Sequence, residues 1–340
     1  MPRQLDTLPE PLLVAQPAQL ADLLGGPTLI HLSGRRVQPL FISVLLHGNE
    51  TTGFFAVQKL LQRYHNRELP RALSLFVGNV EAARNGVRRL AGQPDYNRVW
   101  PGSEWEPCPE QRMMAAITDI MRARQPFASV DVHNNTGVNP HYACVNRVDH
   151  RFIRLGSLFS RTLVYFTRPR GVQSTAFADF CPAVTVECGK VGQTAGVDHA
   201  LEFLDACMHL SGIPDTPVAA HDVDLFHTVA TVKVPRAYSF GFTDPEADIH
   251  FIEDLDRFNF RELPAGTVLA RLNDSVTGQP LEATDEEGRD VSEVYFEAVD
   301  GEVRTRRRVM PSMFTLDERV IRQDCLGYLM ERYLLPGSGG

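Results

Sequence analysis

Short apolar runs alternate with amphipathic segments between residues 38 and 213, and this alternation predicts most of the core. The apolar runs predict buried strands over residues 40–46, 73–77, 127–132, 141–145 and 183–186. Apolar residues at helical spacing predict helices over residues 51–64, 109–124, 151–164 and 197–210. Because strands and helices alternate, we expect an α/β fold with a mixed, mostly parallel sheet flanked by helices.

The pattern changes after residue 213. Residues 221–334 contain segments of alternating apolar and polar residues, such as 228–234 and 294–298, separated by turns rich in Gly and Pro. Four regions are therefore expected, in chain order: an irregular lead-in over residues 1–36, an α/β domain over 37–215, a smaller β-rich C-terminal domain over 216–335 and a disordered tail over 336–340. A short helix around residues 20–24 of the lead-in is left open.

Composition and charge narrow the class of protein. The chain has 340 residues and a net charge of -8, which argues against a nucleic-acid binder because such proteins carry a basic surface. No segment approaches the roughly 20 apolar residues that span a bilayer, and the N-terminus does not resemble a secretory leader. The six cysteines form no C-x-x-C pair, as expected for reduced thiols. We expect a cytoplasmic protein without nucleic-acid or membrane partners; a homo-oligomer is left open.

Three side chains that bind metals follow predicted strands. His47 and Glu50 are spaced H-x-x-E directly after the strand over 40–46, and His133 follows the strand over 127–132. Two imidazoles and one carboxylate form a zinc site that leaves a fourth position open for water, which is typical of catalysis. A single histidine at a strand end is more often an ordinary polar group, but the three together favour one Zn²⁺ per chain.

A fourth residue, Glu187, ends the predicted strand over 183–186. The carboxyl ends of parallel strands meet at one edge of a sheet, so Glu187 should lie near the three ligands. There it could accept a proton from water and pass it to a leaving nitrogen. The alternative is a surface ion pair or an acid at a helix start. Asp131 could orient His133 or cap a neighbouring turn, and the residues leave both roles open.

The segment over residues 95–102 contains Asn97 and Arg98. An arginine side chain binds a carboxylate with two parallel hydrogen bonds, which suits a hydrolase acting on a free amino-acid terminus. The alternative is an exposed basic loop.

These motifs together resemble the succinylglutamate desuccinylase/aspartoacylase family, a branch of the zinc carboxypeptidase superfamily. Five blocks match in order: H-G-N-E-T-T-G at 47–53, G-N-V-E-A leading to R-R at 78–89, D-Y-N-R-V-W-P-G at 95–102, D-V-H-N-N-T-G at 131–137 and V-E-C-G at 186–189. The blocks cover roughly residues 40–210, and the β-rich remainder resembles the C-terminal domain of the family.

The resemblance implies a reaction and roles for several residues. The reaction is hydrolysis of an N-acyl amino acid, with zinc held by the three ligands and Glu187 acting first as base and then as acid. The resemblance also implies that Arg89 polarises the scissile carbonyl. It further implies that Asn97 and Arg98 bind the α-carboxylate of the substrate.

The chain departs from the family pattern at two places. The spacing from Arg89 to Asn97 is one residue longer than usual, so Arg88 is a second candidate for the site. Members of the family often bind the side-chain carboxylate of the substrate with another arginine. Arg168 and Arg170 are the candidates here, and neither has the usual offset from Glu187.

Two other functions compete with deacylation. The same machinery could cleave short peptides as a zinc carboxypeptidase, or the chain could be a non-catalytic relative that only binds zinc or a ligand. A C-terminal domain that caps the site would exclude peptides, and residues 221–334 are long enough to form such a cap. The presence of Glu187 argues against loss of catalysis.

Overall fold

The computed structural model describes residues 2–244 and 246–335, which divide into two compact units. Unit 1 contains the chain up to Asn134 together with His141–Asp224, and unit 2 contains Asn135–Pro140 and Leu225–Leu334. The expected tail over residues 336–340 lies outside the described residues. None of the described helices combines the length and apolar character that a bilayer-spanning helix needs.

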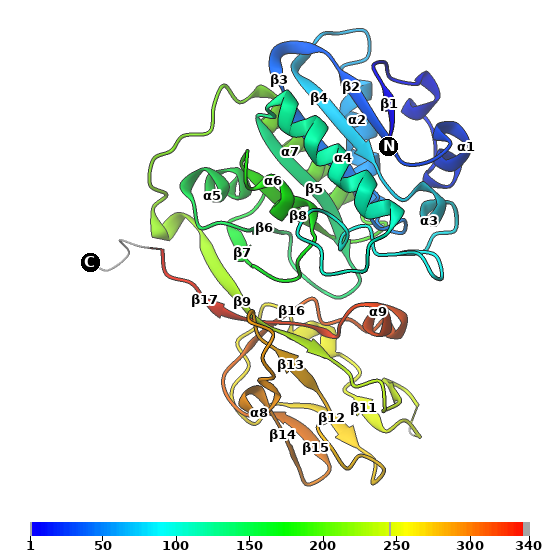
Figure 1. The fold of residues 1–340 in the computed structure, drawn as a ribbon. Helices are drawn as coiled ribbons and strands as arrows, with labels where there is room; N and C mark the ends of the chain where they lie inside the picture. The colour runs from blue at the N-terminus through cyan, green and yellow to red at the C-terminus, as the bar shows by residue number, and fades with distance from the viewer. Residues whose placement is uncertain (1, 245, 336–340) are drawn as a thin grey trace. The chain divides into compact units, whose positions relative to one another are not determined.

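Unit 1 is built on one mixed sheet (Figure 1). In spatial order its strands are β1 (Arg3–Leu5), β2 (Thr28–Leu32), β4 (Leu69–Val77), β3 (Gly34–Val44), β5 (Ala128–Asn135), β8 (Ala183–Lys190), β6 (Tyr142–Val145) and β7 (Thr162–Tyr165). Strand β3 runs parallel to both β4 and β5, whereas β2 and β6 are antiparallel to a neighbour. The predicted fold class, a mostly parallel sheet flanked by helices, is confirmed.

Strands β5 and β8 lie side by side and run in the same direction. Near their starts, the Ser129 amide donates to the Pro182 carbonyl over 2.9 Å. Near their ends, the Asn134 side chain donates to the Gly189 carbonyl over 2.8 Å. Both strands are buried along almost their whole length, which explains why they appear in the sequence as continuous apolar runs. Their carboxyl ends, with His133 and Glu187, therefore emerge at the same edge.

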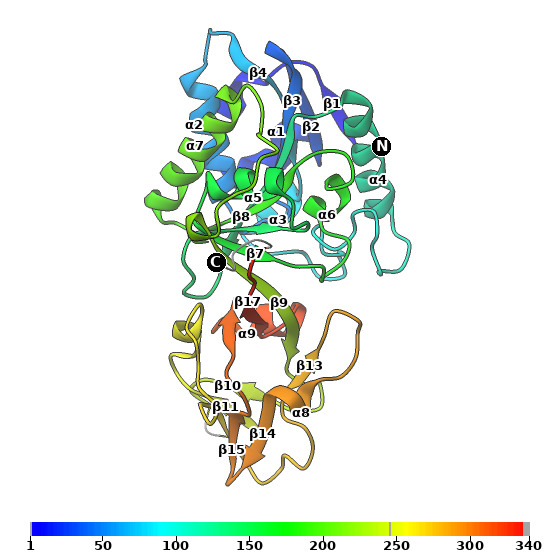
Figure 2. The same cartoon turned by 90° about the vertical axis from the view of Figure 1, so that its left-hand side faces the viewer.

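Helices cover both faces of this sheet. Figure 2 shows α2 (Thr52–Arg63) and α7 (Thr194–His209) on one side and α4 (Pro109–Arg124) on the other. Each was predicted within three residues at either end. The shorter helices are α1 (Leu20–Leu24), α3 (Val80–Arg84), α5 (His150–Ser157) and α6 (Gln173–Phe177).

Two expectations from the sequence differ from the structure. The helix expected over residues 151–164 ends at Ser157, and Thr162–Tyr165 instead forms β7, which pairs with β6. Apolar residues continue through both elements, so helical spacing did not reveal the break. The lead-in over residues 1–36 was expected to be irregular apart from a short helix around residues 20–24. Helix α1 lies there, but the lead-in also contains β1, β2 and the start of β3, which were not expected. These strands are stabilised by pairing with distant segments rather than by local pattern.

Unit 2 is rich in strands, as predicted. In one group β17 (Gly327–Arg332) pairs with both β9 (Asp224–Lys233) and β16 (Met310–Ser312), and β13 (Glu282–Thr284) also pairs with β9. A separate sheet has the order β10 (Phe240–Gly241), β11 (Ile249–Phe251), β12 (Val268–Leu272), β15 (Glu302–Thr305) and β14 (Phe296–Val299). The short helices are α8 (Ser292–Tyr295) and α9 (Glu318–Gln323). That this region caps the metal site stays a prediction.

The loop Asn135–Pro140 follows the strand of His133 and is anchored inside unit 2. The Asn259 side chain donates to the Phe314 carbonyl and accepts from the Phe314 amide, each over 2.8 Å. A Cβ atom on Gly137 would lie 1.9 Å from the same Phe314 carbonyl oxygen, so only glycine fits there. The Val138 amide donates to Asp256 over 3.1 Å.

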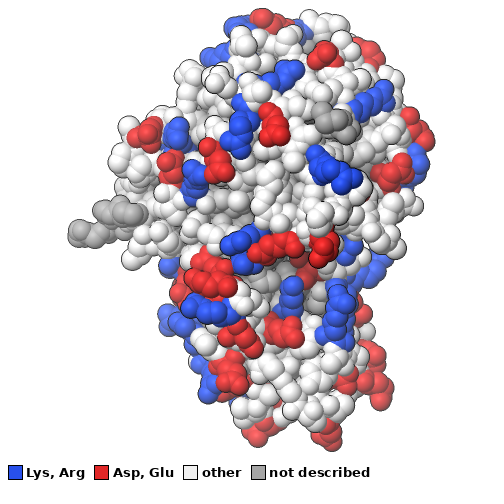
Figure 3. Space-filling model, in the orientation of Figure 1, with Lys and Arg blue, Asp and Glu red and all other residues white. Residues whose placement is uncertain are grey.

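Charges of both signs are interspersed over the face shown in Figure 3. The basic run over residues 304–308 follows this rule, because its arginines pair with glutamates. Arg304 lies 2.8 Å from Glu302, and Arg307 lies 3.4 Å from Glu331. Neighbouring carboxylates therefore offset much of the positive charge of this run.

Candidate metal centre

His47, Glu50 and His133 converge in unit 1. One ligand atom from each lies within 4.8 Å of the other two, and all three side chains are buried. The two Nδ1 atoms face the two oxygens of one carboxylate: His47 Nδ1 lies 2.8 Å from Glu50 Oε1, and His133 Nδ1 lies 2.7 Å from Glu50 Oε2. The three predicted ligands can therefore share one ion.

The turn that carries His47 and Glu50 is held closely against α3. A Cβ atom on Gly48 would lie 2.2 Å from the Ala83 amide nitrogen, so a larger residue would displace the turn. The Glu50 amide donates to the His47 carbonyl over 3.1 Å, which closes the turn and brings both side chains to one side. The Asn134 amide also donates to Glu50 Oε2 over 3.1 Å.

Two further carboxylates hold the outer nitrogens of the imidazole rings. His47 Nε2 lies 3.0 Å from Asp95 Oδ1, and His133 Nε2 lies 2.7 Å from Asp131 Oδ2. Asp131 is in turn held by the Ser43 hydroxyl, which donates to it over 2.7 Å. Of the two roles left open for Asp131, the structure supports the one that orients His133. Such partners determine ring orientation and strengthen a histidine as a ligand.

The cluster favours a cation electrostatically. Burial alone would raise the pKa of Glu50, but the imidazoles of His47 and His133 hold it well below its ordinary value. Burial would likewise lower the pKa of His133, but Asp131 and Glu50 hold it well above its usual range. The histidines therefore act as counter-charges for buried acids. A metal ion can take over that role, so the donor set fits a divalent cation.

Glu187 belongs to the same site. It is only 4 % exposed, and burial raises its pKa to about 8. The charges of His133 and Arg88 oppose this rise, while those of Glu50 and Asp131 add to it. Glu187 therefore lies close enough to the candidate ligands for their charges to act on it, and its burial keeps its pKa near 8.

Of the two neighbouring arginines, Arg88 is the one that lies at the ligands. Its Nη1 lies 3.3 Å from His47 Nδ1 and 3.6 Å from Glu50 Oε1. Its Nη2 donates to Asp95 over 2.9 Å. Arg89 Nη1 instead donates to the Gln93 carbonyl over 2.6 Å. The longer spacing before Asn97 thus corresponds to a change in which arginine faces the site.

Asn97 and Arg98 border the cluster. The Asn97 side chain lies 3.3 Å from His133 Nε2, and its oxygen accepts the Gln173 amide over 3.3 Å. Arg98 is half-buried, and its Nη1 donates to the Asn97 carbonyl over 2.8 Å. Its positive charge helps to lower the pKa of Asp95, after the stronger effects of Arg88 and His47 overcome burial. Both predicted carboxylate-binding residues therefore lie at the site.

Arg170 lies in a different environment. Its guanidinium is 3.4 Å from Glu104, and more than half of the side chain is exposed. Arg168 donates to the same carboxylate over 2.9 Å. A substrate contact for Arg170 stays a prediction.

Asp95 is the site residue that sequence reasoning missed. It is 4 % exposed and bridges Arg88 to His47, while the Asn97 amide donates to its Oδ1 over 2.8 Å. In the sequence, only its position pointed to it: Asp95 begins the family-like segment over residues 95–102, two residues before Asn97. The sequence did not show that this carboxylate would reach an imidazole 48 residues earlier in the chain.

Comparisons with solved structures show which folds this chain resembles. A solved structure of the succinylglutamate desuccinylase from Chromobacterium violaceum aligns with a TM-score of 0.54 at 19% identity, over 89% of this chain and 87% of that one. A succinylglutamate desuccinylase/aspartoacylase from Rhodobacter sphaeroides aligns with a TM-score of 0.59 at 16% identity, over 89% and 88%. Murine aminoacylase 3 aligns with a TM-score of 0.57 at 14% identity, over 88% and 97%. At these identities the likeness shows the fold.

The sequence itself matches a family model. A search of curated proteins finds no match to this chain. The model of the succinylglutamate desuccinylase/aspartoacylase catalytic domain matches residues 37–209, which is just over half of the chain and includes every residue of the candidate site. The chain therefore belongs to the succinylglutamate desuccinylase/aspartoacylase family.

Proposed function

We propose that this protein is a zinc-dependent hydrolase that removes the acyl group from an N-acyl amino acid, with one Zn²⁺ per chain. The single observation that carries the proposal is the convergence of His47, Glu50 and His133 beside the buried acid Glu187. Family membership supports it, and so do the names of the structural neighbours, which are desuccinylases and an aminoacylase.

Zinc fits this ligand set better than other metals. Two imidazole nitrogens and one carboxylate are the donors of catalytic zinc sites, whereas magnesium and calcium prefer sites made of oxygen atoms. When bound, the ion supplies Lewis acidity, which activates water and polarises a carbonyl group. Asp95 and Asp131 keep the two imidazole rings turned toward the ion and add negative charge around it.

Glu187 transfers the proton. Its carboxylate accepts a proton from the attacking water and later donates it to the nitrogen of the departing amino acid. A group with this role works best when its pKa lies near the working pH. Burial raises the pKa of Glu187 to about 8, and a nearby cation would lower it toward neutrality.

Arginines complete the site. Arg88 takes the role of polarising the scissile carbonyl, because its guanidinium lies beside the ligands, although the family pattern assigned that role to Arg89. Asn97 and Arg98 bind the α-carboxylate of the substrate, and with an ion held by His47, Glu50 and His133 this contact would position the amide bond beside the site. Arg98 can turn its fork toward a carboxylate, which forms two charged hydrogen bonds.

A deacylation screen tests the proposal. Zinc-loaded protein is assayed against N-succinyl, N-acetyl and longer N-acyl amino acids, with short peptides as a separate arm, and His133→Ala serves as the metal-site control. Release of a free amino acid by the native chain alone supports a deacylase. Turnover confined to peptides would favour a carboxypeptidase. Full zinc occupancy without turnover on any arm would favour a binding protein.

A further inference from the structure

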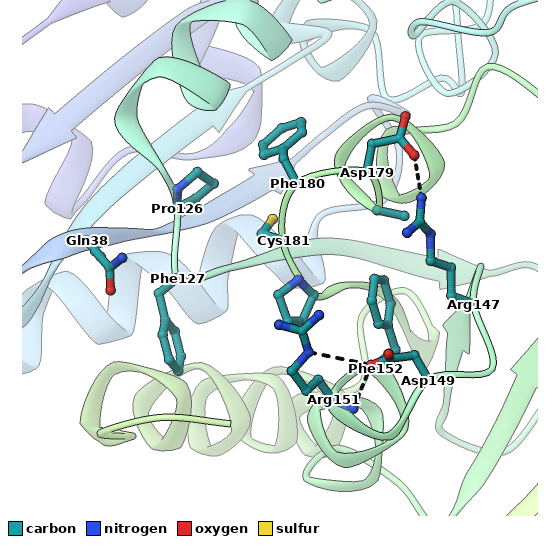
Figure 4. Close-up of a pocket in the computed structure, with 12 residues that line it drawn as sticks. Gln38, Pro126, Phe127, Arg147, Asp149, Arg151, Phe152, Asp179, Phe180 and Cys181 are labelled. Carbon is teal, nitrogen blue, oxygen red and sulfur yellow. Dashed lines mark hydrogen bonds and ion pairs between the residues drawn. The ribbon is translucent and has the colours of Figure 1, made fainter. Parts of the chain in front are cut away.

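Unit 1 contains a cavity of about 310 Å³ that lies far from the metal centre (Figure 4). Phe127 and Pro182 line it and directly precede β5 and β8, whose opposite ends carry His133 and Glu187. At about 3.3 Å per residue, the strand from Ala128 to His133 spans about 17 Å. A small molecule in this cavity therefore cannot touch the reacting groups.

Three buried side chains form part of the cavity wall, and the segments beside them are held in place. Phe152, Ala178 and Cys181 line it although each is less than a tenth exposed. Backbone hydrogen bonds hold the two flanking segments: the Phe127 amide donates to the Pro39 carbonyl over 2.8 Å, and the Pro182 carbonyl accepts from Ser129 over 2.9 Å. The cavity therefore exists before any ligand binds.

Two arginines at the rim of the cavity form exposed ion pairs with aspartates and could instead bind a ligand. Figure 4 shows Arg147 extended toward Asp179 and Arg151 turned toward Asp149. About half of each arginine side chain is exposed, and the Arg151–Asp149 separation is 3.6 Å. Exposed ion pairs of this kind contribute little to stability, because solvent screens them. Either guanidinium can therefore leave its aspartate for a ligand at small cost.

Two further arginines make the surroundings positive. The Arg71 guanidinium lies 3.6 Å from the centre of the Phe127 ring, and that of Arg122 lies 4.5 Å from the centre of the Phe180 ring. Both rings line the cavity. Within residues 2–244 and 246–335, neither arginine pairs with a carboxylate. Arg71 is 1 % exposed and donates only to two backbone carbonyl oxygens, so its charge has no counter-ion.

We propose that this cavity binds a small organic carboxylate with a flat apolar body. The four arginines at or behind its walls carry more positive charge than its two aspartates carry negative charge. The cavity therefore favours an anion. Arginine forks bind carboxylates with two parallel hydrogen bonds. The partly exposed rings of Phe127 and Phe180 offer a small surface for an apolar body. The volume lies at the small end of the range for ligand pockets, which limits the occupant to about one ring with a short chain.

Calorimetric titration of the full chain with 3-phenylpropionate tests the proposal, with 3-phenylpropionamide as the neutral analogue. We expect the carboxylate to bind and the amide to bind at least about tenfold more weakly, because a hydrogen bond between charged groups contributes about 1.5–3 kcal/mol. Arg147→Gln and Arg151→Gln should each weaken binding by at least the same factor. Arg35→Gln, which removes an exposed arginine outside the cavity, should leave binding unchanged.

A metal-site variant separates this cavity from the active site. His133→Ala should keep carboxylate binding, whereas loss of binding in that variant would place the probe at the metal centre and overturn the proposal. Equal binding of the amide, or unchanged affinity in both arginine variants, would also overturn it. So would the absence of binding heat at about 10 mM probe, a concentration that fills even a site with a Kd of about 1 mM.

Discussion

Replacing Glu187 with glutamine should stabilise the metal-free protein, although it removes a residue that we propose is catalytic. Burial raises the pKa of Glu187 from its ordinary value of 4.5 to about 8. Between these two values the folded protein keeps a proton that the unfolded chain has lost. The free energy of unfolding of the native sequence therefore falls as pH rises through this window. Glutamine does not ionise, so the variant is spared this loss.

The expected magnitude follows from the pKa difference. At pH 7 the unfolded chain is 2.5 pH units above the ordinary pKa of 4.5. Each unit corresponds to 1.36 kcal/mol, so the variant should be more stable by up to about 3 kcal/mol at pH 7. At pH 4 the carboxyl group is mostly protonated in both states, so this advantage should nearly vanish. Bound zinc favours the carboxylate, so metal-loaded protein should show a smaller gain.

Urea unfolding of chelator-treated proteins, followed at several values from pH 4 to pH 8, measures this difference. Glu81→Gln replaces an exposed acid, and we expect it to change stability by less than about 0.5 kcal/mol. A gain from Glu187→Gln that is the same at pH 4 and pH 7 would refute the ionisation argument. A loss of stability at pH 7 would show that the carboxylate itself is stabilising in the fold.

Three further substitutions test other parts of the structure. Asp95→Asn should weaken zinc binding by about 10–100-fold in a competition assay with a coloured chelator, because it removes the charge that orients an imidazole; unchanged affinity would exclude this role. Gly137→Ala should destabilise unit 2 by about 2 kcal/mol or more in urea, since its Cβ would overlap the Phe314 carbonyl, whereas Gly212→Ala, which adds a methyl group in open space, should not. Arg98→Ala should raise KM for N-acyl amino acids by about 10–100-fold and change KM for the α-amide analogues far less; equal losses on both would contradict a carboxylate contact.

The sequence was sufficient to predict the metal ligands, but not the residues that hold those ligands in place. His47 and Glu50 are three residues apart, so one tight turn brings them together, and His133 follows an apolar run that predicted a buried strand. Asp95 and Arg88 lie in an irregular loop between α3 and α4, where no periodicity predicts which way a side chain points. The choice between Arg88 and Arg89 therefore could not be made from spacing.

Some elements of secondary structure could likewise be predicted from the sequence, and others could not. The helices α2 and α4 were predicted because each buries one apolar stripe, which leaves a period in the sequence. Strands β1 and β7 were missed because they are short and are stabilised by pairing with distant segments. Strand pairing is a long-range interaction, so a local pattern carries little trace of it.

By itself, the sequence determined the α/β core, the β-rich remainder and the three candidate ligands, because these depend on burial pattern and on residue type within short motifs. Only the tertiary structure decided which carboxylates orient the histidines, which arginine faces the metal site and where a cavity bordered by arginines opens. These features depend on contacts between segments dozens of residues apart. In a buried site a shift of a few ångströms changes which charges interact, and no local pattern encodes that distance.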